Sequence, residues 1–218
     1  MGPKTLGQDK MLVIVDYDMG NVRSVAKAFD ILGVKTLISR RLDDIKRAGW
    51  LVLPGVGAFG DGMGNLRKFG LIEALTIEVL KNRKPFLGIC LGMQLLARDS
   101  QEFGQQQGLG WLKASVKPFE FKDRSLKVPH VGWNKIRFKE NCPLFNHLKQ
   151  ETAFYFVHSY YFECDSPELS AASCDYGMGF TAAVWQDNIF ATQFHPEKSQ
   201  LHGLKLLQNF INWRPTSL

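Results

Sequence analysis

The chain has 218 residues, of which 45% are hydrophobic, so it can bury a sizeable core as one large domain or two small ones. No apolar run approaches the roughly 18 residues of a membrane span, and the N-terminus lacks the pattern of a signal peptide, so we expect a soluble, cytoplasmic protein with no membrane partner. The net charge is +6, but the basic residues are scattered and form no recognisable module. We therefore expect no nucleic-acid partner.

The first ten residues are polar and aperiodic, and we expect a disordered leader over residues 1–10, followed by a single domain over residues 11–215. In the first half of that domain, strands and helices alternate. The expected strands are Leu12–Val15, Lys35–Ile38, Trp50–Leu53 and Pro85–Ile89. The expected helices run from Asn21 to Gly33, through the apolar stripe Leu66–Val79, and from Leu91 to Ala97.

The second half of the chain is rich in β-branched and aromatic residues separated by turns. The expected strands lie within Val128–Phe138, Thr152–Glu163, Leu169–Cys174, Phe180–Trp185 and Ile189–Phe194, and the last two form a hairpin around Q-D-N. A final helix is expected over Gln200–Trp213. This order predicts an α/β fold: a doubly wound, mostly parallel sheet with an antiparallel β addition in the C-terminal half.

The four cysteines stand at positions 90, 142, 164 and 174. No two have the spacing of a zinc ribbon, and a chain without an export signal is a poor setting for a disulfide framework. We expect no disulfides, no metal site and no cofactor, and we expect three of the four thiols to be inert.

Cys90 is the exception. It lies in K-P-F-L-G-I-C-L-G-M-Q-L-L-A, where an expected strand meets an expected helix. An isolated cysteine in an apolar run is by default a structural thiol. Here the pattern G-x-C-x-G is the cysteine form of the nucleophile elbow, a strained turn that leaves room only for glycine at Gly88 and Gly92. The turn also places the sulfur at a helix N-terminus, which favours a nucleophilic thiolate.

A nucleophilic thiol needs a base, and His195 in Q-F-H-P-E-K-S stands out among the five histidines. It follows an apolar strand, Pro196 prevents that strand from continuing, and Glu197 can turn back to orient the imidazole. Alone, H-P-E is more often a loop with a surface histidine. Together with the elbow cysteine, it completes a set of nucleophile, base and orienting acid.

The motif P-G-V-G ends the third expected strand. Two glycines around one residue permit a peptide to turn an N–H group inward, where it can stabilise the oxyanion formed when a thiol attacks a carbonyl. An ordinary glycine turn explains the pattern equally well.

Five motifs together resemble the class I (triad-type) glutamine amidotransferases, in that family's order: P-G-V-G-A-F-G-D-G-M, G-I-C-L-G-M-Q, V-P-H-V-G-W-N, F-V-H-S-Y-Y and F-H-P-E-K-S-Q. Within the family, the chain closely resembles the glutaminase subunits of imidazole glycerol phosphate synthase, an enzyme of histidine biosynthesis. The resemblance covers Met11 to Trp213. V-P-H-V-G-W-N and D-N-I-F-A-T-Q-F-H-P-E-K-S-Q point to this subfamily.

The resemblance implies hydrolysis of L-glutamine to glutamate and ammonia through a γ-glutamyl thioester. Cys90 would attack the side-chain amide carbon, His195 would move the protons, and Glu197 would orient His195. The resemblance further assigns oxyanion stabilisation to the backbone of Gly55, Val56, Gly57 and Leu91, and binding of the two ends of glutamine to Gln94, Glu102, Ser159 and Tyr160. Without the resemblance, Gln94 is equally well a helix-surface residue, and Ser159 and Tyr160 a strand end.

The resemblance also implies a heterodimer with a (β/α)8-barrel synthase (cyclase) subunit, which receives the ammonia and makes imidazole glycerol phosphate. The segment Val128–Lys135 is a candidate docking face, although core packing of Val131 and Trp133 explains it at least as well. Asp18 stands where the family usually has glycine, and Val131 where methionine is common. Both departures bear on which synthase is the partner.

Three other functions remain open. The chain could be a paralogous glutaminase subunit that feeds a sugar amidotransferase. It could instead be a free-standing cysteine hydrolase, which would turn over fully without a partner, whereas a subunit has a low basal activity that rises in the complex. A catalytically inactive binding module would require a damaged triad.

Overall fold

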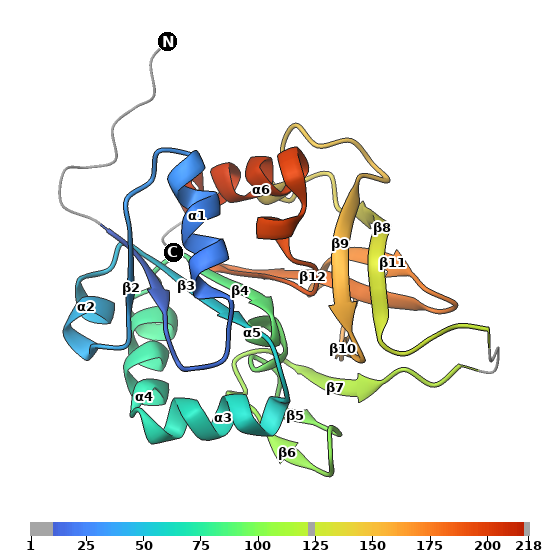
Figure 1. The fold of residues 1–218 in the computed structure, drawn as a ribbon, viewed down its shortest axis with the longest axis horizontal. Coiled ribbons are helices and arrows are strands. Elements are labelled where there is room, and N and C mark those ends of the chain that lie inside the picture. The colour runs from blue at the N-terminus through green and yellow to red at the C-terminus, as the bar shows by residue number, and fades with distance from the viewer. Residues whose placement is uncertain (1–10, 122–124, 216–218) are drawn as a thin grey trace.

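The computed structural model describes residues 11–121 and 125–215, so the expected leader over residues 1–10 lies outside the described residues. Figure 1 shows a sheet with helices on both faces, which continues on one side into a group of antiparallel strands. Within the described ranges, no helix is long and apolar enough to cross a bilayer.

Five parallel strands form one half of the sheet, in the order β2-β1-β3-β4-β13. Their bounds are β1 (Leu12–Val15), β2 (Thr36–Ser39), β3 (Trp50–Gly55), β4 (Phe86–Cys90) and β13 (Ile189–Thr192). The chain steps from β1 out to β2 and then back across β1 to β3 and β4. This reversal of direction is the doubly wound arrangement that the sequence predicted.

Helices cover both faces of these strands (Figure 1). The helices are α1 (Val22–Ile31), α2 (Leu42–Arg47), α3 (Phe59–Lys68), α4 (Leu71–Thr76), α5 (Leu91–Gln94) and α6 (Gln200–Asn212). Successive side chains of β1 point to opposite faces. Leu12 and Ile14 join the core formed with α1 and α6, whereas Val13 and Val15 join the core formed with α2, α3 and α4.

Two predicted helices need correction. The single helix expected over Leu66–Val79 is interrupted between α3 and α4, because Gly70 has a left-handed backbone with φ +64°. The second piece then ends in a π-helical turn, η1 (Ile77–Lys81). The helix expected to reach Ala97 ends at Gln94, so α5 has only four residues. The short helix α2 was not predicted at all.

The other half of the sheet is largely antiparallel. Its strands are β5 (Asp99–Ser100), β6 (Gln106–Gln107), β7 (Ala114–Pro118), β8 (His130–Phe138), β9 (Ala153–His158), β10 (Tyr160–Cys164), β11 (Ser170–Asp175) and β12 (Gly179–Gln186). The short 3₁₀ turn η2 (Pro143–Phe145) lies between β8 and β9, and η3 (Pro196–Lys198) lies between β13 and α6. β12 and β13 form the expected hairpin, with Gln186 opposite Ile189. Because β13 also pairs in parallel with β4, it joins the two halves.

The carboxyl ends of β3, β4 and β13 lie at one edge of the sheet. In the register of β3 and β4, Gly55 is opposite Cys90, and in that of β13 and β4, Thr192 is opposite Ile89. The predicted oxyanion segment, nucleophile and base therefore begin from neighbouring strand ends, which is where parallel sheets place their binding sites.

Candidate active site

Cys90 ends β4 in a backbone conformation that residues with side chains rarely adopt, with φ 54° and ψ −108°. A Cβ atom on Gly92 would collide with the carbonyl oxygen of Leu53, and one on Gly88 would lie 2.8 Å from the carbonyl oxygen of Gly92. These contacts explain why glycines flank the cysteine, as the elbow pattern predicted. Because α5 is so short, its dipole stabilises a thiolate less than the sequence suggested.

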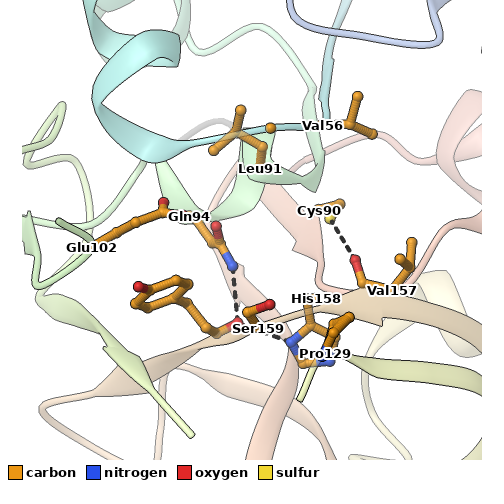
Figure 2. Close-up of a pocket in the computed structure, with 11 residues that line it drawn as sticks. Val56, Cys90, Leu91, Gln94, Glu102, Pro129, Val157, His158 and Ser159 are labelled. Carbon is orange, nitrogen blue, oxygen red and sulfur yellow. Dashed lines mark hydrogen bonds between the residues drawn. The ribbon is translucent and has the colours of Figure 1, made fainter. Parts of the chain in front are cut away.

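The thiol opens into a cavity of about 340 Å³. Most of the residues predicted for the site line it, namely Val56, Gly57, Cys90, Leu91, Gln94, Glu102, Ser159 and Tyr160. Figure 2 shows Cys90 on one side of this cavity, and Gln94 with Glu102 on the other. Pro129, which belongs to the expected docking segment, completes the wall together with Val157 and His158, for which the sequence predicted no role.

His195 and Glu197 lie behind the wall of this cavity rather than on its surface. The Nδ1 atom of His195 and the Oε1 atom of Glu197 are 2.8 Å apart, and both side chains are 2% exposed. Burial by itself would lower the pKa of His195, but the neighbouring Cys90 sulfur and the Glu197 carboxylate outweigh it and raise that pKa to about 10. This environment favours an imidazolium beside the sulfur.

The second ring nitrogen of His195, Nε2, is buried and has no hydrogen-bond partner among the described residues. Since Glu197 engages Nδ1, Nε2 is the atom left to exchange a proton with the thiol or with a substrate. Buried polar atoms almost always have partners, so an unpaired one next to a thiol indicates a reacting group.

Within the described part of the chain, two other groups form hydrogen bonds with the Cys90 sulfur. The thiol donates to the carbonyl oxygen of Val157 at 3.9 Å, which Figure 2 shows as a dashed line. The sulfur also accepts from Nε2 of Gln193 at 3.6 Å. The motifs predicted no role for Gln193, although a polar residue between an apolar strand and H-P-E is a visible signal.

The predicted oxyanion segment passes beside the thiol, but its central N–H group is already engaged. The N–H of Val56 donates to the carbonyl oxygen of Met19 at 2.7 Å. Gly57, the next residue, has φ +101°, a conformation that favours glycine. The N–H of Leu91 lies at the first position of α5, where helices offer no internal acceptor.

The residues predicted to bind glutamine are buried or half-buried around the cavity. Gln94 is only 6% exposed, so the helix-surface alternative is wrong. Its Nε2 group donates to the carbonyl oxygen of Tyr160 at 3.0 Å and to Oε1 of Gln193 at 3.1 Å. Glu102 accepts from the N–H of Phe59 at 2.6 Å, and burial raises the pKa of this carboxyl group.

The segment expected to dock a partner is exposed next to the cavity. Val131 and Trp133 on β8 are 55% and 48% exposed, so core packing does not explain them. Pro129, one step before β8, lines the cavity, and Val131 pairs with Val157, the acceptor of the thiol bond.

Asp18, the departure from the family pattern, has φ +62°, so this position requires the left-handed backbone that glycine adopts easily. Arg40 donates to Asp16 at 2.8 Å and also to Asp18, and so fixes the turn between β1 and α1. That turn carries Met19.

The remaining cysteines have the character of inert thiols. All four cysteines are free. Burial raises the pKa of Cys142 to about 11 and that of Cys174 to about 12, and it also raises the pKa of Cys164. Thiols with such pKa values are poor nucleophiles near neutral pH.

Residues 13–213 match the family model described as "Glutamine amidotransferase class-I". The chain is 48% identical over 201 residues to imidazole glycerol phosphate synthase subunit HisH 1 of Campylobacter jejuni strain RM1221, covering 92% of this chain and 99% of that protein. It is 50% identical over 206 residues to the HisH subunit of Sulfurimonas denitrificans, with coverage of 94% and 99%. HisH 2 of Pseudomonas aeruginosa PAO1 is 45% identical over 201 residues, with coverage of 92% and 98%.

Solved structures agree on the fold. A crystal structure of a glutamine amidotransferase superposes with a TM-score of 0.71 at 20% identity, covering 92% of this chain and 97% of that one. PurLQS from Thermotoga maritima superposes with a TM-score of 0.71 at 19% identity, with coverage of 94% and 99%.

Proposed function

The chain belongs to the class I glutamine amidotransferase family, and from that premise we propose that it is the glutaminase subunit of an imidazole glycerol phosphate synthase, which supplies ammonia for histidine biosynthesis. Three relatives that are 45–50% identical to the chain carry that subunit's name, and the match to each of them covers nearly its whole length. The observation that carries the chemistry is the strained Cys90 at a cavity, with the buried pair of His195 and Glu197 directly behind it.

The proposed reaction has two halves. In the first, the Cys90 thiolate attacks the side-chain amide carbon of L-glutamine, and the imidazolium of His195 protonates the departing nitrogen, which leaves as ammonia. In the second, His195 takes a proton from water, the resulting hydroxide attacks the γ-glutamyl thioester, and glutamate leaves as the thiolate is regenerated. Once the sulfur is acylated, its charge no longer raises the pKa of His195, so the imidazole can act as the base.

Both halves form an oxyanion, and we assign its stabilisation to the N–H groups of Leu91 and Val56, with Gly55 and Gly57 giving the segment its mobility. Val56 must first leave the carbonyl of Met19. Because this bond must break first, we expect the chain alone to have a low glutaminase activity. That activity would rise when the segment turns the N–H of Val56 towards the cavity.

For the substrate, we assign the carboxylate of Glu102 and the Oε1 atom of Gln94 to the α-ammonium group, because both oxygens can accept hydrogen bonds at the cavity wall. Ser159 and Tyr160 would hold the α-carboxylate end on the opposite strand segment. The cavity volume suits a ligand of amino-acid size.

The partner in this proposal is a (β/α)8-barrel synthase subunit, bound as a heterodimer and fed with ammonia directly. We name the exposed apolar side chains of Val128, Val131 and Trp133 the docking face. A partner that covers the docking face would also close the cavity at Pro129 and keep ammonia away from water.

Residues 11–215 form one domain in this proposal. Strand β13 supports this, because it pairs with β4 of the parallel half of the sheet and with β12 of the antiparallel half. We further propose that the complex works in the cytoplasm.

The test is a glutaminase assay of the full chain alone and with candidate partner synthases. We expect low turnover alone and strong stimulation by an imidazole glycerol phosphate synthase barrel. Stimulation only by a sugar amidotransferase would instead identify a paralogue. Full turnover without a partner would identify a free-standing hydrolase, and no glutamate under any condition would identify a binding module.

A further inference from the structure

The side-chain amide of Gln193 is held in one orientation by a chain of hydrogen bonds. The carbonyl oxygen of Tyr160 can only accept, so the atom of Gln94 that faces it at 3.0 Å must be the amide nitrogen. The other hydrogen on that nitrogen then goes to Gln193 at 3.1 Å, which must present its oxygen. The nitrogen of Gln193 is thereby turned to the Cys90 sulfur, 3.6 Å away. Figure 2 shows the first of these bonds as the dashed line that starts at the amide nitrogen of Gln94.

Gln193 is also fully buried, and a backbone hydrogen bond holds it in the sheet. Its side chain is 0% exposed, and its backbone N–H donates to the carbonyl oxygen of Ala182 at 2.8 Å, which continues the pairing of β13 with β12. Burying an amide is costly unless its groups are bonded, and the contacts with Gln94 and Cys90 provide those bonds. A neutral apolar residue would fill the same space without this cost.

The two contacts of the sulfur respond differently when the thiol loses its proton. The bond to the carbonyl oxygen of Val157 needs the S–H hydrogen, so ionisation abolishes it and leaves two negative atoms facing each other. The bond from Gln193 becomes charge-assisted and strengthens. Of these two groups, only Gln193 favours the thiolate over the thiol.

The other titratable groups around the sulfur do not replace this donor. His195 faces it from the segment after β13, with Glu197 behind, and supplies the imidazolium. Tyr17 faces it from the turn after β1 and keeps its proton, because burial and the sulfur raise its pKa, but its buried hydroxyl forms no hydrogen bond with the sulfur or with any other described residue. His158 on β9 has a pKa lowered to about 3 by burial, and its two ring nitrogens face the carbonyl oxygen of Tyr160 and His130. Glu102 lies across the cavity and accepts from the N–H of Phe59.

We propose that Gln193 is a catalytic residue of the site: its Nε2–H group, aimed by Gln94 and Tyr160, binds the Cys90 thiolate and holds it ready for attack. The role rests on the proposed function of Cys90 as nucleophile. It supplies the stabilisation that the four-residue helix α5 gives only weakly. Gln193 also connects the thiol to Gln94, the residue that we assign to substrate binding. The nucleophile and this substrate-binding residue therefore belong to one chain of hydrogen bonds.

The experiment measures the rate of alkylation of Cys90 by iodoacetamide in the full chain, without glutamine or partner, at pH values between about 5 and 10. Mass spectrometry quantifies the modified peptide, so the other three cysteines do not interfere. The variants are Gln193→Leu, which removes the donor, and Gln193→Glu, which keeps the shape and places a carboxylate against the sulfur. The matched control is Thr192→Val, which removes a buried hydroxyl one residue away that donates to the carbonyl oxygen of Phe194.

We expect the pH midpoint of alkylation to rise by about one to two units in Gln193→Leu, the size of a lost hydrogen bond to a charged group. The rise should be larger in Gln193→Glu, and Thr192→Val should leave the midpoint in place. The kcat/KM for glutamine should fall about 10-fold or more in both Gln193 variants. Thermal melting identifies the variants that fold.

An unchanged midpoint in a folded Gln193 variant would overturn the proposal, whatever happens to turnover. An equal rise in Thr192→Val would also overturn it, because the effect would then be local loosening. If wild-type protein hydrolysed no glutamine but the midpoint still moved in the Gln193 variants, the proposed function would fail and the thiolate contact would stand.

Discussion

The backbone N–H of Val56 donates a 2.7 Å hydrogen bond to the carbonyl oxygen of Met19. Val56 borders the cavity beside Cys90, so this bond withholds from the site a donor that the proposed reaction needs. The same turn holds the neighbouring residues. The hydroxyl of Tyr17 fills the space where Gly55 lacks a side chain, and the Met19 side chain lies behind Gly57. The turn between β1 and α1 therefore sets the resting position of the whole segment.

Replacing Val56 by proline removes the N–H group itself. We expect Val56→Pro to lower kcat for glutamine by about 10²- to 10³-fold, with or without the partner, because an oxyanion donor is lost. Alkylation of Cys90 by iodoacetamide forms no oxyanion, so its rate should remain within a few-fold of wild type. Val56→Ala keeps the N–H group and serves as the control. Near-normal turnover in Val56→Pro would remove Val56 from the oxyanion site.

The triad assignment is tested at the thiol. We expect Cys90→Ser to lower glutaminase turnover by about 10⁴-fold or more, since a hydroxyl beside His195 is a much weaker nucleophile. A glutamine-like electrophile should label Cys90 in the wild type, as mapped by mass spectrometry. Cys164→Ser changes a half-buried thiol away from the cavity and should keep full activity. Labelling at another cysteine would contradict the assignment.

The pH profile tests the pair of His195 and Glu197. The Glu197 carboxylate helps to raise the pKa of His195 to about 10, so Glu197→Gln should lower that pKa. The imidazolium is lost as pH rises through its pKa, and a lower pKa therefore moves the alkaline limb of kcat/KM to lower pH. Turnover should also fall by about 10²-fold or more, because the ring loses its fixed orientation. An alkaline limb that stays in place would show that another group controls it.

Partner binding is tested on the docking face. Trp133→Glu puts a charge on an exposed apolar side chain, and we expect it to weaken the complex with the synthase about 30-fold or more and to reduce stimulation accordingly. The control is Leu201→Glu, which changes an even more exposed apolar residue on α6, away from β8. Titration calorimetry gives the affinity. Equal effects of both substitutions would indicate a nonspecific loss of binding.

Stability in acid is tested at a buried histidine pair. The Nδ1 atom of His130 and the Nε2 atom of His158 are 3.0 Å apart. Burial lowers the pKa of His130 to about 4 and that of His158 to about 3. In the unfolded chain both protonate near pH 6.5, so the folded state binds fewer protons below that pH. Their contribution to stability is thus complete above about pH 6.5 and is lost as pH falls towards 4.

Urea unfolding near pH 7.5 and pH 5 should therefore show a loss of up to about 2 kcal/mol for each imidazole. His130→Gln should reduce this pH dependence, although it lowers stability at both pH values by removing the ring that stacks on Tyr176. His147→Asn changes an exposed histidine and should leave the pH dependence as it is. A wild-type stability that does not change over this range would contradict the buried, neutral pair.

Much of the fold could be predicted because its signals are local. The buried strands of the parallel half are short apolar runs, and their predicted bounds agree with β1, β3 and β4 to within two residues at each end. The interruption at Gly70 was missed because the apolar spacing continues from α3 into α4 across the break. The regular spacing of hydrophobic side chains does not reveal that one residue between them has a left-handed backbone.

The sequence by itself predicted the elbow, because both glycines stand within two residues of Cys90, although the carbonyl oxygen that excludes a side chain at Gly92 belongs to Leu53 on the neighbouring strand. It also placed His195 and Glu197, the proposed base and its orienting acid, two residues apart. Only the tertiary structure decided what surrounds the sulfur: Gln193 reaches it from 103 positions away, and Val56 turns its N–H to Met19 rather than to the cavity. The direction of a peptide or an amide depends on which distant groups can accept its hydrogen, and those are fixed only when the strands assemble.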